Sequence, residues 1–394
     1  MKKTLLILLI LLLSFYFSSL CFGGNMNKEF IKANNEFGFK LLKDLKDKNT
    51  NIMISPISIE SALGALSGAG ATTEKNSILQ ALGANSLTID QLNQNNKELL
   101  RLCKTPGKGI TLNLATSLWL QNNLNPNKKY KDFLKNYYNA DISNVNFANP
   151  DKAADIINQW CSNKTNHMVS KAVDKSSLEN ASTVLCNALY FFGTWTEPFD
   201  EKLTREDIFT PYVKSAFKVA MMSKSGNMDY VSTNTFKAIK LNYGTDKDFS
   251  IDIIVPNNEK DLNICLAQLE KTGKSVFETH PVKNDFVKIY IPRFQMDYQT
   301  SLIEILEKYG LKRGDYKNLL ETSKTNRISN IIHSTKLKVN EKGTEASAVT
   351  SIIMPMSAFT QEEIRADKPF VFYIYDTKNK LIFFTGIINS PDSL

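Results

Sequence analysis

The segment from residue 339 to residue 358 constrains the fold more than any other, because it alternates like a strand without the composition of a permanent one. One face of this period-two pattern is small or apolar, and the other starts charged and becomes mixed. The first face consists of Thr344, Ala346, Ala348, Thr350, Ile352 and Met354, and the second of Glu345, Ser347, Val349, Ser351 and Ile353. Gly343 precedes the alternation, and Pro355 ends it because proline has no ladder donor. The pattern indicates a segment that could join a sheet as a strand but does not need to be paired in one. The alternative is an ordinary edge strand followed by a surface loop.

The first 23 residues have the pattern of a secretory signal peptide. Lys2 and Lys3 precede an apolar run from Leu5 to Leu13, and small residues follow Phe17. An uncleaved anchor is the alternative, although the apolar run is short for a membrane span. We expect cleavage after Cys21 or Gly23, a secreted extracellular protein, and no membrane attachment.

Four cysteines would remain after cleavage: Cys103, Cys161, Cys186 and Cys265. They contain no Cys-x-x-Cys pair, so the sequence predicts no metal site. One or two disulfides are possible in an oxidising compartment, but the spacing cannot assign them. Cys186 lies in an apolar run and reads as a buried free thiol. Asn163 and Asn180 begin glycosylation sequons, which the secretory prediction makes usable.

The net charge of +8 does not by itself indicate a polyanion site, because the basic residues are scattered. Lys128-Lys129, Lys271 with Lys274, and Lys312-Arg313 are short clusters typical of solvated surfaces. No motif supports nucleic-acid binding.

Helical and strand patterns alternate along the whole chain, without a repeat or a linker that would separate domains. We therefore expect one α+β domain over residues 24–394. The predicted helices are 27–45, 57–70, 91–102, 130–138, 153–164, 262–271 and 302–309, and residues 71–74 resemble a capping box. The predicted strands are 51–54, 110–120, 184–192, 238–243, 249–255, 287–294, 335–339, 370–375 and 381–388.

Several motifs, in the same order, resemble those of the serpins, the serine-protease-inhibitor superfamily. The run from Asn340 to Ala348 resembles the serpin hinge, and the run from Arg365 to Phe372 resembles the segment by which serpins re-enter their core. Ser55-Pro56-x-Ser58 resembles the start of the packed central helix. The pattern Asn-Ala-Leu-Tyr-Phe-x-Gly-x-Trp-x-x-Pro-Phe, from Asn187 to Phe199, is complete.

The resemblance implies a serpin fold, with three β-sheets, about eight or nine helices and an exposed reactive-centre loop at about residues 341–364. It assigns a polar latch beneath the main sheet, the shutter, to Ser55, Pro56, Ser58, Asn187 and His333. At the top of that sheet, Glu341 would pair with Arg293 near Trp195 and resist premature opening.

The sequence offers little support for an active site of its own. Its three histidines are His167, His280 and His333, and it has no Gly-x-Ser-x-Gly elbow, His-Glu-x-x-His motif or phosphate-binding loop. His333 has an apolar context and reads as a satisfied core histidine. We expect no enzymatic activity and no cofactor.

The resemblance implies that a serine protease attacks the loop as a substrate and becomes trapped as its acyl-enzyme when the freed segment inserts into the main sheet. Such insertion needs small, uncharged inward residues near the hinge. The hinge comprises Glu341, Gly343, Thr344, Glu345, Ala346, Ser347, Ala348, Val349 and Thr350. Its inward residues Thr344, Ala346, Ala348 and Thr350 are small and uncharged, as insertion requires. Val349 is larger, but it falls on the wetter face. The hinge therefore indicates an inhibitor.

The reactive bond is predicted less sharply. Counting seventeen residues with Glu341 as the first, the usual family spacing, places it between Ser357 and Ala358. Counting back eleven residues from Pro369 gives Ala358-Phe359, and a resemblance to an elastase-inhibitor bait gives Met356-Ser357. None of these presents Arg or Lys, which favours elastase-like or chymotrypsin-like targets over trypsin-like ones.

We therefore expect a secreted, monomeric suicide inhibitor that forms a covalent acyl complex with a serine protease. The alternatives are a non-inhibitory serpin acting as a carrier, storage or chaperone protein, and an inhibitor of cysteine proteases. Polyanion binding is expected to be weak or absent, because the helix that serpins use for it corresponds to residues 91–102, where Lys97 and Arg101 are the basic residues.

Overall fold

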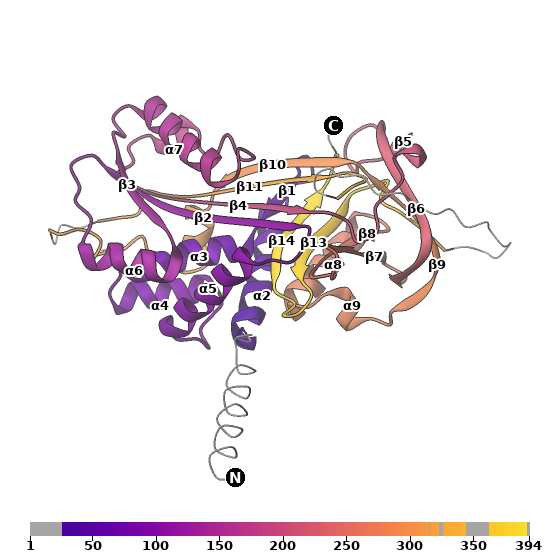
Figure 1. Ribbon diagram of the computed structural model, residues 1–394, viewed down its shortest axis with the longest axis horizontal. Coiled ribbons are helices and arrows are strands. Elements are labelled where there is room, and N and C mark those ends of the chain that lie inside the picture. Colours follow the sequence, from indigo (N-terminus) through magenta and orange to yellow (C-terminus); the bar gives the residue numbers. More distant parts are fainter. Residues whose placement is uncertain (1–25, 315, 323–325, 344–361, 392–394) are drawn as a thin grey trace, which may run out of the picture.

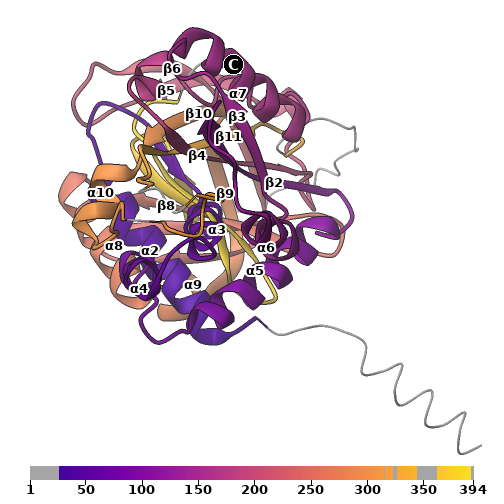
Figure 2. The same cartoon turned by 90° about the vertical axis from the view of Figure 1, so that its left-hand side faces the viewer.

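The structure is a computed structural model that describes residues 26–314, 316–322, 326–343 and 362–391. These residues form a mixed α+β molecule around two hydrogen-bonded sheets (Figure 1). Most helices at the left of Figure 1 lie below the five-stranded sheet, whereas α7 lies above it. The same division is visible after a quarter turn (Figure 2).

The five-stranded sheet has the order β10-β11-β4-β2-β3. Its strands are β2 (Ile110–Gln121), β3 (Asp141–Val145), β4 (Thr183–Gly193), β10 (Phe294–Ser301) and β11 (Asn330–Val339). The central neighbours β4 and β11 are parallel, and each has an antiparallel neighbour on its other side. We call the boundary between β4 and β11 the central seam.

The other sheet has nine strands, in the order β1-β14-β13-β8-β7-β6-β9-β12, with β5 also paired to β6. They are β1 (Ile52–Ile54), β5 (Arg205–Phe209), β6 (Phe217–Ser232), β7 (Phe236–Tyr243), β8 (Phe249–Pro256), β9 (Lys283–Pro292), β12 (Glu362–Arg365), β13 (Phe370–Asp376) and β14 (Ile382–Ile388). The long strand β6 pairs with β9 over residues 221–230 and with β7 only over residues 230–232. Two of the three expected sheets are therefore joined through the end of β6.

Nine α-helices and two short 3-10 helices lie within the described residues, in agreement with the expected number. The α-helices are α2 (Lys28–Leu45), α3 (Pro56–Ser67), α4 (Thr72–Ala81), α5 (Ile89–Lys104), α6 (Lys128–Tyr138), α7 (Pro150–Lys164), α8 (Glu259–Thr272), α9 (Val276–Thr279) and α10 (Ile303–Lys308). The 3-10 helices are η1 (Lys175–Leu178) and η2 (Glu201–Leu203).

Helix α3 lies at the centre, and all of its residues are buried. The Ser55 hydroxyl caps its N-terminus by accepting from the Ser58 amide, and Pro56 occupies the first turn, where its missing N–H costs nothing. The glycine, alanines and serines of α3 let neighbouring elements approach closely: a Cβ at Gly64 would lie 2.4 Å from the Tyr138 hydroxyl oxygen of α6.

The side chains of β4 alternate between two hydrophobic clusters, as expected for a strand buried on both faces. Leu185 and Leu189 belong to the main core, which lies on the α3 side. Val184, Cys186 and Ala188 belong to a second cluster, which α7 covers. The sheet therefore has apolar contacts on both faces.

Some predicted elements need correction. The strand predicted over residues 287–294 is two strands, because Arg293 separates β9 from β10. His333 lies inside β11 and not before it, since pairing begins at Asn330. At the start of α4, only the Glu74 half of the capping box exists: the Glu74 carboxylate accepts from the Ala71 amide, but an alanine side chain has no acceptor. Strands β3, β5, β6, β10 and β12 and helix α9 were not predicted.

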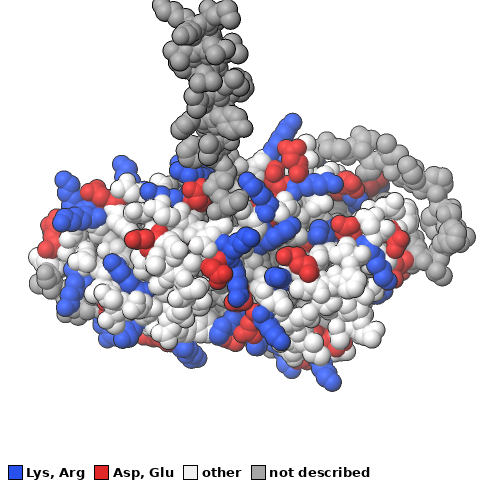
Figure 3. All heavy atoms as spheres, turned by 90° about the horizontal axis from the view of Figure 1, so that it is seen from below, with Lys and Arg blue, Asp and Glu red and all other residues white. Residues whose placement is uncertain are grey.

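The surface charges are mixed. On the face shown in Figure 3, acidic side chains lie among the basic ones. Helix α2 illustrates this, because Lys40 pairs with Asp44 and Lys43 pairs with Glu270 of α8. Among the described residues, none of the helices combines the length and apolarity needed to cross a bilayer.

We predict that Gly386→Ala destabilises the protein. A Cβ at Gly386 would lie 2.6 Å from the Ile52 carbonyl oxygen and from Cε1 of Phe372, so the β1–β14 pairing would have to shift. Overpacking of this kind costs about 1–3 kcal/mol. Urea-induced unfolding would measure the loss. Gly226→Ala in β6 is the control, because no atom lies within 4 Å of its Cβ position; equal losses in both variants would contradict the packing argument.

Candidate functional site

A polar latch joins the central seam to the N-terminus of α3. His333 of β11 and Asn187 of β4 are register partners, and their Nδ1 and Oδ1 atoms lie 2.9 Å apart. Asn187 Oδ1 also accepts from the Ser58 hydroxyl, and Asn187 Nδ2 donates to the Ser58 carbonyl oxygen at 2.6 Å. The latch therefore connects both strands of the seam to one helix.

The hydrogen bonds fix the state of the His333 ring. The Ser55 amide donates to Nε2 at 3.0 Å, so Nε2 is an acceptor. The ring proton is therefore on Nδ1, which donates a hydrogen bond to Asn187 Oδ1. His333 is fully buried, and this burial lowers its pKa to about 3. The ring is neutral at physiological pH and serves as a structural connector.

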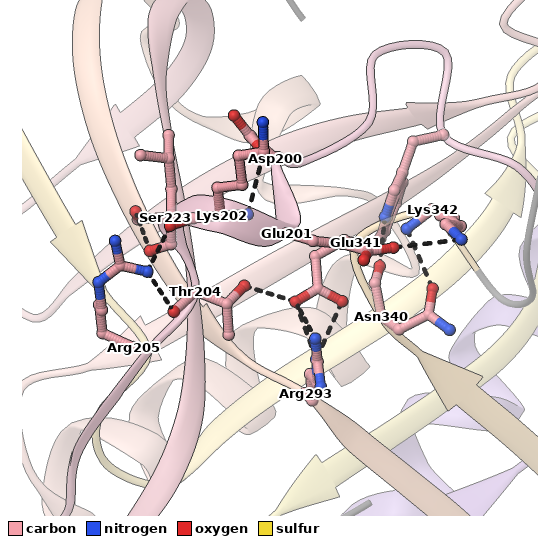
Figure 4. A network of polar contacts seen from close by, with 12 residues as sticks. Asp200, Glu201, Lys202, Thr204, Arg205, Ser223, Arg293, Asn340, Glu341 and Lys342 are labelled. Atoms are coloured by element: carbon pink, nitrogen blue, oxygen red, sulfur yellow. Dashed lines mark hydrogen bonds and ion pairs between the residues drawn. The ribbon is translucent and has the colours of Figure 1, made fainter. Parts of the chain in front are cut away.

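The end of the seam at which β11 finishes is held by an ion pair between Glu341 and Arg293 (Figure 4). Arg293 Nε lies 2.8 and 2.9 Å from the two carboxylate oxygens of Glu341, and Nη2 lies 2.7 Å from Oε1. The Thr204 hydroxyl donates to the same carboxylate. Burial opposes ionisation of Glu341, but the hydrogen bonds from Arg293 and Thr204 outweigh it and lower its pKa. Glu341 is 3% exposed, so removing its partner would leave a buried charge.

The backbone of residues 340–343 is fixed to the turn that follows β4. Trp195 Nε1 donates to the Asn340 carbonyl at 2.8 Å, and its amide donates to the Lys342 carbonyl at 3.1 Å. The Trp195 ring stacks on Tyr243 with centroids 4.2 Å apart. Gly343 has a φ of 127°, and a Cβ there would lie 2.1 Å from the Gly193 carbonyl oxygen. Only glycine fits this position without a backbone shift.

The central seam is paired along only part of its length. Seven register pairs join residues 330–336 of β11 to residues 184–190 of β4. Beyond them, within the described residues, β11 pairs only with β10 and β4 only with β2, until an isolated bridge joins Thr194 to Gly343. The unpaired part lies directly next to the point where the segment from residue 344 begins.

The other end of that segment is anchored by Arg365, whose role was not predicted. Arg365 ends the edge strand β12, contacts Asp207 of β5, and lies 2.9 Å from Glu363 and 3.2 Å from Asp367. Its guanidinium also lies 4.0 Å from the centre of the Tyr290 ring. The sequence signal was an arginine between acidic residues, but Asp207 and Tyr290 are too far along the chain to be recognised as partners.

Several predicted site residues lie outside the described residues, and their roles remain predictions. They are Thr344, Glu345, Ala346, Ser347, Ala348, Val349 and Thr350 of the hinge and Met356, Ser357, Ala358 and Phe359 of the reactive bond. The signal peptide 1–23 also lies outside them. Asn163 is exposed on α7, and Asn180 is exposed in a left-handed turn with a φ of 57°.

Residues 32–391 match the family model described as serpin (serine protease inhibitor). The chain belongs to the serpin family. An uncharacterized serpin-like protein of Methanosarcina acetivorans is 30% identical over 372 residues, which cover 91% of this serpin and 86% of that protein. The Arabidopsis AtSerpin1 structure, in the native stressed conformation, is 25% identical, with a TM-score of 0.81 over 93% of this chain and all of that chain.

The same fold occurs in human thyroxine-binding globulin complexed with thyroxine, which is 22% identical with a TM-score of 0.81 over 93% of this chain and all of that one. At this level of identity the likeness concerns the fold alone. Serpins are generally protease inhibitors, but the fold also serves this ligand complex, so inhibition must be argued from the site.

We predict that His333→Gln removes a pH dependence of stability. The folded pKa of about 3 lies below the unfolded value of 6.5, so the unfolded chain binds the extra proton and stability falls as pH drops through 6.5. Between pH 7.5 and pH 5 this contribution amounts to about 2 kcal/mol. The urea midpoint of the wild type should therefore fall between pH 7.5 and pH 5, and the midpoint of His333→Gln should fall by less, by the amount that this contribution represents. His167→Gln, on an exposed residue, is the control and should keep the wild-type trend.

We also predict that Arg293→Met destabilises the folded state by about 3 kcal/mol, because it leaves the Glu341 charge buried without its partner. Arg293→Met/Glu341→Met should recover most of this loss, since neither charge remains. The double-mutant cycle is measured by urea-induced unfolding. Lys342→Met is the control, because its partner Glu201 is exposed. Additive effects of the two substitutions would contradict a buried pair.

Proposed function

We propose that this serpin is a secreted inhibitor of elastase-like or chymotrypsin-like serine proteases, and that it traps the protease as an acyl-enzyme by inserting its cleaved loop into the central seam. The observation that carries the proposal is the partly paired seam beside Gly343. It combines with the small inward residues of the hinge, which the sequence supplies.

The strand directions support insertion at the seam. β11 ends at Val339, the chain reverses through residues 340–343, and a strand that follows would run antiparallel to β11. Because β4 is parallel to β11, the same strand would also be antiparallel to β4. One parallel boundary would become two antiparallel ones, which are slightly more stable per residue. Each added ladder bond contributes about 0.5–1.5 kcal/mol.

The covalent step would use the chemistry of the protease. The catalytic serine oxygen attacks the carbonyl carbon of the residue before the cleaved bond, with Ser357 as the first candidate. The protease histidine takes the serine proton and gives it to the departing Ala358 amine. An ester then joins the inhibitor to the protease, and the new amino terminus leaves. Insertion of the segment from Thr344 onward carries the ester-linked protease away before water attacks the ester.

The uncut protein must then be a kinetically trapped state. The latch of His333 and Asn187 closes the paired part of the seam, and the Glu341–Arg293 pair holds its unpaired end. Both would have to rearrange during insertion. Arg365 would keep β12 in place when the loop is cut, so that only the segment before the cleaved bond is released.

We further propose a monomer without a cofactor or enzymatic activity of its own. Weak or absent polyanion binding agrees with the interspersed charges in Figure 3. A non-inhibitory carrier, storage or chaperone serpin is the second candidate, which the small inward hinge residues disfavour. Cross-class inhibition of cysteine proteases is the third.

The test is to mix the protein with elastase, and separately with chymotrypsin, and to run a denaturing gel. We predict a complex that survives SDS, together with a small C-terminal peptide whose mass places the cut among residues 356–359. Thr344→Arg should be cleaved at the same bond but form no complex, because a buried unpaired charge blocks insertion. Undiminished complex formation by this variant would overturn the insertion mechanism.

Clean cleavage without a complex is resolved by the thermal unfolding of the cut protein. A large rise in the unfolding midpoint means that the loop inserts and that the chosen protease was not a target. An unchanged midpoint means that the hinge does not insert, which favours the non-inhibitory alternative. Glu345→Arg is the matched control for Thr344→Arg. Residue 345 belongs to the wetter face of the predicted strand, so an arginine there should leave complex formation intact.

A further inference from the structure

One continuous stretch of the chain contacts both described ends of the segment that is proposed to insert. It covers residues 199–210 and includes η2 and the edge strand β5. We call this stretch the strap. The first root, residues 340–343, precedes the inserting segment, and the second root, residues 362–367, follows it. The strap therefore connects the two places where that segment joins the folded molecule.

The strap holds the first root through three contacts, and Figure 4 shows those made between side chains. The Phe199 amide donates to the Glu341 carbonyl oxygen at 2.8 Å. The Thr204 hydroxyl donates to the carboxylate of the same residue, which is almost fully buried. Glu201 lies 3.1 Å from the Lys342 ammonium, but this pair is open to solvent and contributes little. Glu341 is therefore the residue through which the strap mainly holds this root.

The far end of the strap holds the second root. Asp207 of β5 contacts the Arg365 guanidinium through Oδ2. The Ile208 amide donates to the other oxygen, Oδ1, at 2.8 Å, which orients the Asp207 carboxylate. The Thr210 amide donates to the Asp367 carbonyl oxygen at 2.7 Å. One side chain and one backbone amide of the strap therefore hold this root, as they do at Glu341.

The strap is braced between its two ends. The Arg205 guanidinium donates to the carbonyl oxygens of Lys202 and Thr204, which fixes the junction of η2 with β5. The Ser223 hydroxyl of β6 donates to the Leu203 carbonyl oxygen at 3.3 Å, and β5 pairs with β6 along its whole length. Because both ends belong to one braced piece, a displacement at one end has to be absorbed at the other.

The side chains that hold the two roots are also close together along the strap. Thr204 and Asp207 are three positions apart, so their Cα atoms are at most about 11 Å apart. We propose that the strap positions the two roots relative to each other and couples them, so that loosening its contact with either root loosens its contact with the other. The coupling itself is independent of the proposed function. Its effect on insertion rests on that function, because insertion begins with release of the first root.

The two roots differ in the support that they receive from outside the strap. The second root is also held by the pairing of β12 with β9, by Glu363 and by the Tyr290 ring beneath Arg365. The first root has the Arg293 ion pair and the bonds from Trp195, all of which lie beside the seam. Opening of the seam therefore releases the first root, while β12 keeps its ladder to β9.

The coupling is tested in the uncut protein by amide hydrogen exchange. Thr204→Val removes the hydroxyl that donates to Glu341 and keeps the shape of the side chain. We predict that it speeds exchange of the β12 amides that pair with β9 at least about threefold, although β12 belongs to the other root. Thr204→Ser keeps a hydroxyl and should restore the wild-type exchange. Unchanged exchange of β12 in Thr204→Val would overturn the proposal.

The reverse direction is tested from the second root, because coupling between two sites is reciprocal. Asp207→Asn weakens the contact with Arg365 and should speed exchange of the Phe199 amide, which bonds to Glu341, by a similar factor. Glu363→Gln is the matched control, because Glu363 also pairs with Arg365 but belongs to the second root and not to the strap. Equal effects of the two substitutions on Phe199 would mean that the strap does not carry the coupling.

The effect on insertion is measured with a synthetic peptide of residues 344–355, which can enter the seam without any protease. Uptake is followed by the rise in the thermal unfolding midpoint. We predict that Asp207→Asn takes up the peptide at least about threefold faster than the wild type, because its first root is held less tightly. Glu363→Gln should take up the peptide at the wild-type rate.

The outcomes separate the two proposals. Coupled exchange with equal uptake by Asp207→Asn and the wild type would refute the role of the strap in insertion and leave the inhibitor proposal intact. If none of the proteins takes up the peptide and the cut wild type shows no rise in midpoint, the insertion mechanism itself fails, and the effect of the strap on it fails too. The exchange measurements still decide whether the two roots are coupled.

Discussion

The pairing between β4 and β11 is the interaction on which the rest of the structure depends. It is a parallel boundary in the middle of a sheet, with seven register pairs and an unpaired end. A parallel pair is slightly less stable per residue than an antiparallel pair, and a strand placed between β4 and β11 would be antiparallel to both. Contacts from outside the two strands therefore help to keep the boundary closed, and the structure provides them on three sides.

Each support uses a different kind of interaction. On the α3 side, the hydrogen bonds of a neutral histidine connect both strands to a helix start. On the α7 side, the second apolar cluster covers residues of both strands. At the unpaired end, the half-buried Arg293 neutralises the Glu341 carboxylate. Hydrogen-bond geometry, apolar area and charge pairing respond differently to pH, temperature and salt, so the closed seam does not depend on a single condition.

The two ends of the segment that would insert are held unequally. The backbone carbonyls of residues 340–343 accept hydrogen bonds from the indole and the amide of Trp195 in the turn after β4, next to the place where insertion would begin. The strand β12 is held by its ladder to β9 and by the side chain of Arg365, far from that place along the chain. Cutting between these anchors would free the first end to continue into the sheet while the second stays where it is. This asymmetry follows from the different contacts that hold the two ends.

The sequence by itself determined the α+β class and most of the strongly periodic helices and strands. It grouped Ser55, Ser58, Asn187 and His333 into the latch only through its resemblance to the serpins. It could not determine that His333 lies inside β11, nor that Arg293 interrupts one long apolar pattern, because period two is the same on both sides of the break. Strand β6 was missed because much of it is only half-buried, which weakens the hydrophobic alternation.

Only the tertiary structure decided which distant residues meet. Asp207 and Tyr290 surround Arg365, and Cys161 shares a cluster with Cys186, although nothing in their local sequences indicates a partner. Such contacts arise from strand order and from the placement of α7, which depend on long-range pairing and not on local propensity. The sequence specified which faces are apolar, and the folded chain decided what each face covers.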